Sequence, residues 1–203
     1  MTPRFVYFDL GRVLLDFSVA QMCDQVAQTC GIEPDRVHEA LFAGNLLQAL
    51  EMGRLDEEAF YRQFCGVTGA RPERAELRRA ASDIFTEKED VRGIVSALAG
   101  RGVRLGILSN TCHSHWEHCI GRFAWLGEAF LVHALSFRLG VMKPDAAIFH
   151  RAADLAGVAA EEVFFCDDIE ANAAGARAAG FDAVQFQSAD QLAAELRARR
   201  LLA

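Results

Sequence analysis

Three carboxylates stand where short apolar runs of this sequence end. Asp9 directly follows Phe5–Phe8, and the adjacent pair Asp167 and Asp168 follows Val163–Cys166. Neighbouring carboxylates repel each other unless a cation or the amino end of a helix compensates their charge. Such oxygen ligands suit Mg²⁺, which binds proteins through one or two carboxylates together with phosphate and water. The three side chains are therefore candidates for a nucleophile and a metal site, although a lone aspartate after a strand is more often a cap on loop amides.

Hydroxyl and cationic groups follow other apolar runs. The segment Ser109–Thr111 comes after Val103–Leu108, where it could bind an oxyanion through hydroxyl and backbone N–H groups, or cap the following helix. Lys143 precedes a proline, and it is one of only two lysines among the 21 basic residues. A compact positive charge at that position favours a role beside an anion over a chance placement.

The elements that must position these groups alternate between strands and helices. Apolar runs predict buried strands at 5–8, 103–108, 133–135, 163–166 and 183–186. Apolar residues at helical spacing predict helices across 91–98, 148–155, 171–179 and 192–196. Strands that alternate with helices form parallel sheets, in which the carboxyl ends of the strands share one edge. We therefore expect an α/β fold with the polar groups gathered at one edge of a parallel sheet.

Residues 16–86 interrupt that alternation. They contain several helix-length apolar patterns separated by breaks with glycine or proline, and we expect no strand among them. We interpret them as an all-helical cap domain inserted after the first strand, with residues 1–15 and 87–203 forming the core domain. Glu51 and Arg54 lie at a helix junction of this segment, and they are the cap residues that we expect to touch a substrate.

In this order and spacing, the carboxylate, hydroxyl, lysine and acidic pair resemble the motifs of the haloacid dehalogenase (HAD) hydrolase superfamily. The matching motifs are Phe8–Val13; Leu108–Thr111; Ser136 with Gly140, Lys143 and Pro144; and Phe165–Asp168 with Asn172, Gly175, Ala176, Arg177 and Gly180. The resemblance covers essentially the whole chain. It is strongest to the helical-cap branch that includes α-glucose-1-phosphate phosphatase-like proteins, which share Asp-Leu-Gly in the first motif and a cap segment similar to Leu50–Leu55. It implies a HAD-like Rossmannoid parallel sheet flanked by helices, with a small helical cap.

The resemblance also implies catalytic roles. Asp9 is expected to attack phosphorus and form an aspartyl-phosphate that water hydrolyses. Ser109 and the backbone amide of Asn110 are expected to hold phosphoryl oxygens. Lys143 is expected to stabilise the charge on Asp9 and on the phosphoryl group.

The same resemblance implies a magnesium site. Mg²⁺ is expected to bind Asp9, Asp168 and the backbone carbonyl of Gly11. Asp167 is expected to support these ligands without binding the ion itself, and Asn172 is expected to orient Asp168 or Lys143. Gly11 is a departure from the family pattern, because most phosphatases of the superfamily have an aspartate there as general acid and base.

The missing acid restricts the chemistry. General acid–base help is worth about 10²–10⁴-fold, so its absence favours leaving groups that depart easily, such as that of a sugar hemiacetal phosphate. His113 and His115 follow the serine loop and could replace the acid. We expect both instead on the surface of the helix that follows. Arg12, where the family usually has Gly or Asn, is expected to be a solvated loop residue.

Composition excludes several other classes. The chain has 203 residues, 52% hydrophobic and 24% charged, which is enough for a buried core. Its formal charge of −7 is opposite to that of nucleic-acid-binding surfaces. No apolar run approaches the roughly 20 residues that cross a bilayer, and the first carboxylate comes too early for a signal peptide.

Six cysteines without a C-x-x-C pair favour free thiols. We expect a cytoplasmic monomer or homodimer without nucleic-acid or membrane partners.

Three functions remain open. The leading one is a Mg²⁺-dependent phosphoric monoester hydrolase for a small phosphorylated metabolite, such as the sugar phosphate glucose 1-phosphate. A 2-haloacid dehalogenase shares the fold, the aspartate, the serine and the lysine, but it needs no metal and usually has a serine-rich fourth motif in place of Asp167 and Asp168. A phosphate-binding regulatory protein with weak catalysis is the third, and only Gly11 supports it.

Overall fold

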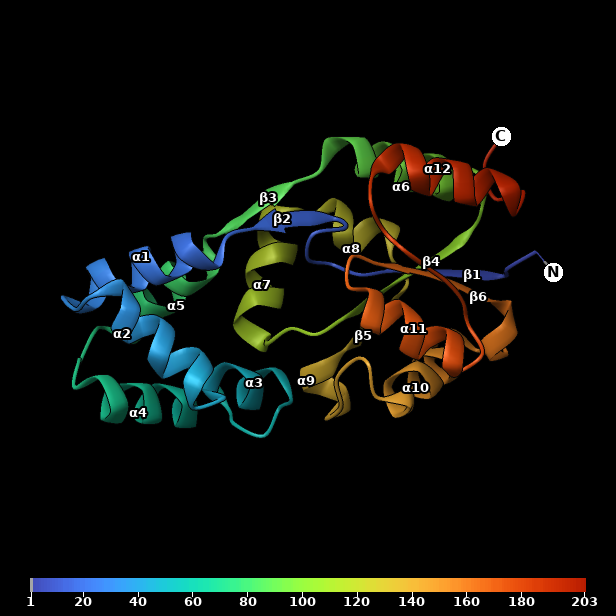
Figure 1. Cartoon of the computed structure of the whole chain (residues 1–203). Coiled ribbons are helices and arrows are strands. Elements are labelled where there is room, and N and C mark those ends of the chain that lie inside the picture. The colour runs from blue at the N-terminus through green and yellow to red at the C-terminus, as the bar shows by residue number, and fades with distance from the viewer. Residues whose placement is uncertain (1) are drawn as a thin grey trace.

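A five-stranded parallel sheet with helices on both faces is the central element of the computed structural model, which describes residues 2–203 (Figure 1). All of its strand pairs are parallel. The strand order is β5 (Val132–Leu135), β4 (Arg104–Ser109), β1 (Phe5–Phe8), β6 (Val163–Asp167) and β7 (Asp182–Gln185). The α/β fold and the parallel sheet expected from the sequence are confirmed.

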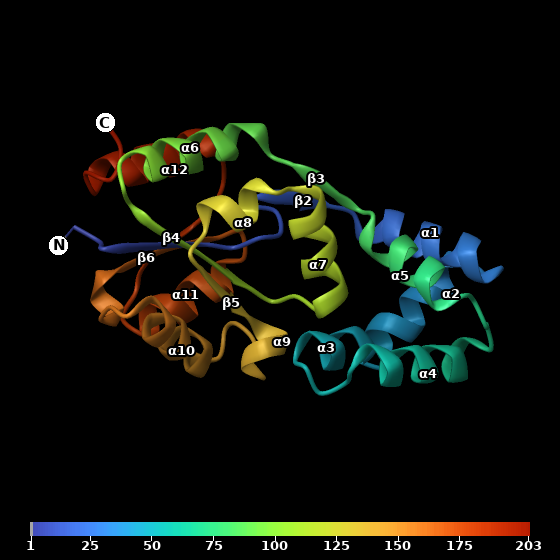
Figure 2. The ribbon, with the colours of Figure 1, turned by 180° about the vertical axis from the view of Figure 1, so that it is seen from behind.

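The sheet is buried on both faces, because successive side chains of a strand point to opposite sides. In β1, Val6 and Phe8 pack into one core, and Phe5 and Tyr7 into the other. Two short elements, α9 (Ser136–Leu139) and the 3₁₀ turn η2 (Ala160–Glu162), lie in the connections. The first core is covered by α6 (Glu89–Gly100), α7 (His113–Arg122), α8 (Trp125–Ala129) and α12 (Ala189–Ala198), and the second by α10 (Ala146–Ala156) and α11 (Glu170–Ala178) (Figure 2).

The register of the sheet brings the polar segments together. Phe8 pairs with Ile107 of β4 on one side and with Cys166 of β6 on the other. The next residue, Asp9, therefore lies at the carboxyl edge between the ends of β4 and β6. Ligands bind at this edge in open α/β sheets.

The chain between β1 and the rest of the sheet forms a separate group of helices, called here the helical group. It lies at one end of the molecule, and α12 lies toward the other (Figures 1 and 2). Ser18 and Asp56 cap two of its helices through side-chain oxygens. Its members are α1 (Val19–Cys30), α2 (Pro34–His38), the π-helical turn η1 (Glu39–Ala43), α3 (Leu46–Glu51), α4 (Glu57–Thr68) and α5 (Arg74–Ser82).

Two short strands connect the helical group to the core, although we expected no strand in residues 16–86. Strands β2 (Leu15–Phe17) and β3 (Phe85–Glu87) pair antiparallel, with Phe17 opposite Phe85. Each has three residues, too few for strand periodicity to be visible in the sequence. The expectation was wrong because each strand is stabilised by a partner far along the chain and not by a local pattern.

The helical group contacts the edge of the sheet through α3 and α4. The Ser136 hydroxyl donates to the Glu51 carbonyl oxygen at 2.6 Å, and the Ser114 backbone N–H donates to the Glu57 carboxylate at 3.0 Å. Just after α3 the backbones come so close that a Cβ on Gly53 would lie 2.3 Å from the carbonyl oxygen of residue 137. Only a residue without a side chain fits there.

Helix α7 packs against α5 and buries a histidine in the contact. His115 Nε2 lies 3.1 Å from the Ala81 carbonyl oxygen, and the ring meets Phe85 edge-on. The expectation that His115 lies on the helix surface is wrong, because α5 covers that side of α7. His113 is exposed, as expected. Burial lowers the pKa of His115, against the opposing effect of nearby Glu51.

Two expectations from composition can be compared with the structure. All six cysteines are free thiols, and five of them are buried. Within residues 2–203, no helix has both the length and the apolar character needed to cross a membrane.

Gly53→Ala is expected to lower the free energy of unfolding by more than Gly31→Ala. Both glycines have left-handed φ angles, +65° and +66°, so either alanine costs about 1–2 kcal/mol in backbone strain. A Cβ on Gly31 has nothing within 4 Å, whereas one on Gly53 collides with the Phe137 carbonyl group. Urea unfolding should show a further loss of about 1–3 kcal/mol at Gly53, the usual cost of overpacking. Equal losses would contradict the close approach.

His115→Gln is expected to make stability less dependent on pH. The folded-state pKa of His115 lies below its ordinary value of 6.5, so the unfolded state binds more protons and stability falls as the pH drops through that value. The thermal midpoint of H115Q should therefore fall less than that of the wild type between about pH 7 and pH 5. His113→Gln, at an exposed position of the same helix, is the control. An unchanged slope in H115Q would show that His115 is not held neutral.

Candidate active site

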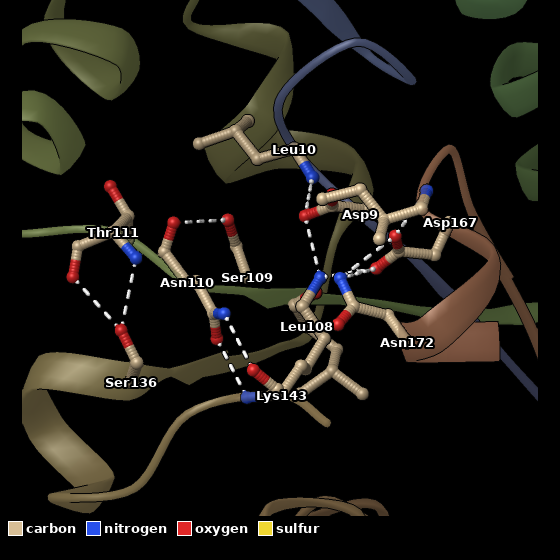
Figure 3. A network of polar contacts seen from close by, with 11 residues as sticks. Asp9, Leu10, Leu108, Ser109, Asn110, Thr111, Ser136, Lys143, Asp167 and Asn172 are labelled. Atoms are coloured by element: carbon tan, nitrogen blue, oxygen red, sulfur yellow. Dashed lines mark hydrogen bonds and ion pairs between the residues drawn. The ribbon is translucent and has the colours of Figure 1, made fainter. Parts of the chain in front are cut away.

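Lys143 lies at the centre of a polar cluster at the carboxyl edge of the sheet (Figure 3). Its Nζ lies 2.9 Å from Asp9 Oδ1 and 2.6 Å from Asp167 Oδ2. It also donates to the Leu108 carbonyl oxygen at 2.9 Å. One ammonium group thus binds the ends of β1, β4 and β6, and all three charged side chains are buried. Removing one partner of such a buried pair leaves an uncompensated charge in the interior.

The Asn110 side chain holds Lys143 in place. Its Nδ2 donates to the Lys143 carbonyl oxygen at 3.0 Å, and its Oδ1 accepts from the Lys143 backbone N–H at 2.9 Å. The amide therefore pairs with the backbone as a strand neighbour would. Sequence reasoning assigned a role only to the backbone of Asn110, and the side-chain contact was missed.

Asp167 is held by two further donors. The Ile169 N–H donates to Oδ1 at 2.9 Å, and Asn172 Nδ2 lies 3.0 Å from Oδ1 and 3.2 Å from Oδ2. Asn172 was expected to orient Asp168 or Lys143, and it contacts Asp167, which in turn binds Lys143. Asn172 lies in the first turn of α11, where it meets the fully buried Asp167, whereas Asp168 is only partly buried.

Asp9, Asp167 and Asp168 together form a carboxylate cluster. One oxygen of each lies within 4.8 Å of the others, close enough to hold a single metal ion. Burial raises the pKa of Asp9, against the effect of Lys143, and burial together with Asp167 raises the pKa of Asp168. Burial alone would lower the pKa of Lys143, but the two carboxylates beside it raise that pKa and keep the lysine charged. One cation among three carboxylates leaves an excess of negative charge, and an all-oxygen donor set fits a hard divalent cation.

The loop after β4 does not cap the next helix. Helix α7 begins at His113, with Cys112 at its N-cap position and no side-chain bond there. Ser109 is buried at the end of β4, and its hydroxyl makes one long hydrogen bond of 3.4 Å to the Asn110 carbonyl oxygen. So weak a bond leaves the hydroxyl free to donate to a stronger acceptor at the edge of the sheet.

Phe17 occupies the space beside Gly11. A Cβ at position 11 would lie 2.8 Å from the ring carbon Cε1 of Phe17. The ring is held on two sides, because the Arg12 guanidinium lies 5.1 Å from its centroid and the Phe85 ring 5.9 Å away. A side chain at position 11 would therefore require the Phe17 ring to move. Arg12 is exposed, as expected, and stacks on this ring.

Glu51 brings a fourth carboxyl group toward the cluster from α3. Burial raises its pKa, His115 lowers that pKa, and Asp9 raises it, so the Glu51 charge interacts with both residues. Arg54 is exposed to solvent. Of the two residues of the helical group expected to touch a substrate, Glu51 is the one whose backbone carbonyl contacts the edge of the sheet, through Ser136.

Comparison with solved structures supports the same fold. A HAD family enzyme from Bacteroides thetaiotaomicron, BT-2542, in complex with magnesium and inorganic phosphate, has a TM-score of 0.81 at 20% identity, over 91% of this chain and 94% of that one. A HAD-like family hydrolase from Porphyromonas gingivalis has a TM-score of 0.77 at 26% identity, over 91% of both chains. L-2-haloacid dehalogenase from Xanthobacter autotrophicus has a TM-score of 0.66 at 20% identity, over 97% of this chain and 83% of that one.

A protein-family model extends the comparison to sequence. The model of the haloacid dehalogenase-like hydrolases matches residues 6–180, a range that begins in β1 and includes the whole of the carboxylate cluster and Lys143. The fold, the matched range and the arrangement of the cluster agree, and the chain belongs to the haloacid dehalogenase-like hydrolase family.

Proposed function

We propose that this hydrolase is a Mg²⁺-dependent phosphatase of small phosphomonoesters, with Asp9 as its nucleophile. The three carboxylates around Lys143 carry the proposal. A divalent cation would cancel their excess charge and attract a phosphate dianion, whereas halide displacement has no use for such a cation. The crystallisation of the similar BT-2542 with magnesium and inorganic phosphate supports the same chemistry.

Asp9 is held for attack on phosphorus. The Leu10 N–H donates to Oδ1 at 2.7 Å, and Lys143 binds the same oxygen, which leaves Oδ2 for the reaction. Oδ2 forms a bond to phosphorus as the bond to the leaving oxygen breaks; the leaving oxygen departs with the electron pair and takes a proton from water. A second water then attacks the phosphorus of the aspartyl-phosphate and gives up a proton to solvent. The bond to Asp9 breaks, and inorganic phosphate is released.

The neighbouring residues bind the phosphoryl group in this proposal. The Ser109 hydroxyl and the Asn110 N–H hold its oxygens, and Lys143 offsets its charge. Asp9, Asp168 and the Gly11 carbonyl are the proposed magnesium ligands, with Asp167 positioning Lys143 behind them. Bound Mg²⁺ would supply positive charge to the phosphoryl oxygens.

Residues 16–86 are proposed to act as a cap over this site. The contacts of α3 and α4 with Ser136 and Ser114 bring the helical group to the edge where the phosphoryl group would bind. The helical insertion and the Asp-Leu-Gly motif support a place in the helical-cap branch with α-glucose-1-phosphate phosphatase-like proteins.

The leaving group determines the rate in this proposal. Position 11 has no acid, His115 is engaged with Ala81, and His113 is exposed, so in this proposal none of the three supplies the general acid and a leaving oxygen that is a weak base is favoured. We therefore expect faster turnover of esters whose alcohol is acidic, including aryl and hemiacetal phosphates.

Hydrolysis of p-nitrophenyl phosphate is the first test, because its activated leaving group needs no acid. We expect release of p-nitrophenol with Mg²⁺ and none with EDTA. Asp9→Asn should lower turnover by about a thousandfold or more, since it removes the nucleophile. Asp24→Asn, at an exposed position of α1, is the matched control. Halide release from a 2-haloacid without Mg²⁺, together with no p-nitrophenol, would identify a dehalogenase instead.

Thermal unfolding measures the metal site independently of activity. Mg²⁺ should raise the thermal midpoint of the wild type, because a ligand at 100 times its Kd stabilises the folded state by about 2.7 kcal/mol. Asp168→Asn should lose most of this shift, whereas Asp24→Asn should retain it. A full shift in D168N would remove Asp168 from the proposed ligands.

A further inference from the structure

A cavity of about 460 Å³ lies within the helical group and is separate from the carboxylate cluster. Its walls come from α1, η1, α3, α4 and α5, and the first turn of α7 closes one side. This volume is in the range of small-molecule binding sites. Neither Asp9 nor Lys143 lines it.

Apolar side chains form most of the wall of this cavity. Among them are Met22, Val26, Leu47, Phe60, Phe64 and Leu77.

Several polar side chains at the cavity already have protein partners. Arg74 is paired with Glu58, Glu57 accepts from a backbone N–H of α7, and His115 contacts a carbonyl oxygen of α5. Pairing reduces the capacity of these groups to replace the water around the hydroxyls of a sugar, although Arg78 and Glu73 also line the cavity. Burial of apolar surface in such a space, in contrast, lowers the free energy of the complex.

Helix α3 connects the cavity to the carboxylate cluster. Leu47 lines the cavity, and Glu51, four residues later, lies on the same side of the helix. Four residues of an α-helix span about 6 Å, the length of a short substituent. Cys112 also lines the cavity, and it lies three residues after Ser109 in the loop that follows β4. The cavity therefore borders two segments, α3 and the loop after β4, that also lead to the edge of the sheet.

We propose that this cavity binds the apolar organic group of the phosphomonoester, so that the substrate is an aryl or alkyl-aryl phosphate and not a sugar phosphate. The inference depends on the proposed phosphatase function, which places the phosphoryl group at Asp9. The site at Gly11 favours the same class, because a phenol leaves more readily than a simple alcohol without a general acid.

Two esters with equally acidic leaving groups test the cavity. 4-Hexylphenyl phosphate and 4-methylphenyl phosphate have the same reacting bonds and differ only in apolar length. Burial of two or more additional methylene groups should lower the KM of the hexyl ester by about tenfold or more, with a small effect on kcat. Glucose 1-phosphate should have the highest KM of the three. Equal KM values for the two aryl esters would overturn the proposal.

Leu47→Trp and Gln48→Trp form a matched pair of variants. Both lie on α3, but Leu47 lines the cavity and Gln48 is exposed. Tryptophan at 47 fills part of the cavity and should abolish the difference in KM between the two esters, whereas tryptophan at 48 should preserve it. A preserved difference in L47W would place the apolar group elsewhere and overturn the proposal.

Binding of 4-hexylphenol, measured by calorimetry, separates failure of this inference from failure of the phosphatase proposal. The neutral phenol carries the apolar group but no phosphate, so its binding does not require catalysis. Binding that is lost in L47W supports the cavity assignment even if neither ester is hydrolysed. No binding to the wild type, together with normal hydrolysis of p-nitrophenyl phosphate, would leave the phosphatase function intact and overturn the cavity assignment.

Discussion

The buried ammonium group of Lys143 is the interaction on which the site depends. Two carboxylates and a backbone carbonyl from three different strands converge on it. Without that charge, the ends of β1 and β6 would place mutually repelling groups in a dry interior. The Asn110 amide and the Asn172 amide hold the two sides of this arrangement, so the sheet edge is a fixed frame before any ligand arrives. Such a frame lowers the reorganisation that a reaction requires.

In the proposed function, chemistry and selectivity are divided between two parts of the chain. Groups able to react lie at the ends of the parallel strands, where the register alone brings them together. The apolar cavity lies in the helical group, which meets the core through the β2–β3 ribbon, through α3 and α4, and through the packing of α5 against α7. One buried apolar cluster includes residues of both parts, among them Leu77 of α5 and Trp116 of α7, so the helical group and the sheet share a core.

The fold and the members of the site could be predicted from sequence for one reason: parallel strands place residues that follow them at one edge. Asp9 directly follows a buried strand, and Ser109 and Asp167 each end one. Their place at the edge of the sheet can therefore be predicted from the strand pattern. The details that could not be predicted depend on contacts between distant segments. Helix α5 buries His115, and β2 forms by pairing with β3, where Phe17 lies opposite Phe85. Both partners are far away in the sequence, so the local pattern shows neither contact. The Asn172 contact with Asp167 was missed because spacing alone does not show which of two adjacent carboxylates points inward.

Packing couples position 11 to Phe17. The space that an acid there would need is filled by the Phe17 ring, which also packs against Phe85 across the ribbon and carries Arg12 on its face. An aspartate introduced at position 11 alone would displace that ring and disturb the ribbon, whereas a smaller residue at position 17 alone would leave a void without adding any chemistry. The two changes are therefore epistatic, each unfavourable until the other is present. In the proposed mechanism, an acid at position 11 would therefore need a matching change at position 17.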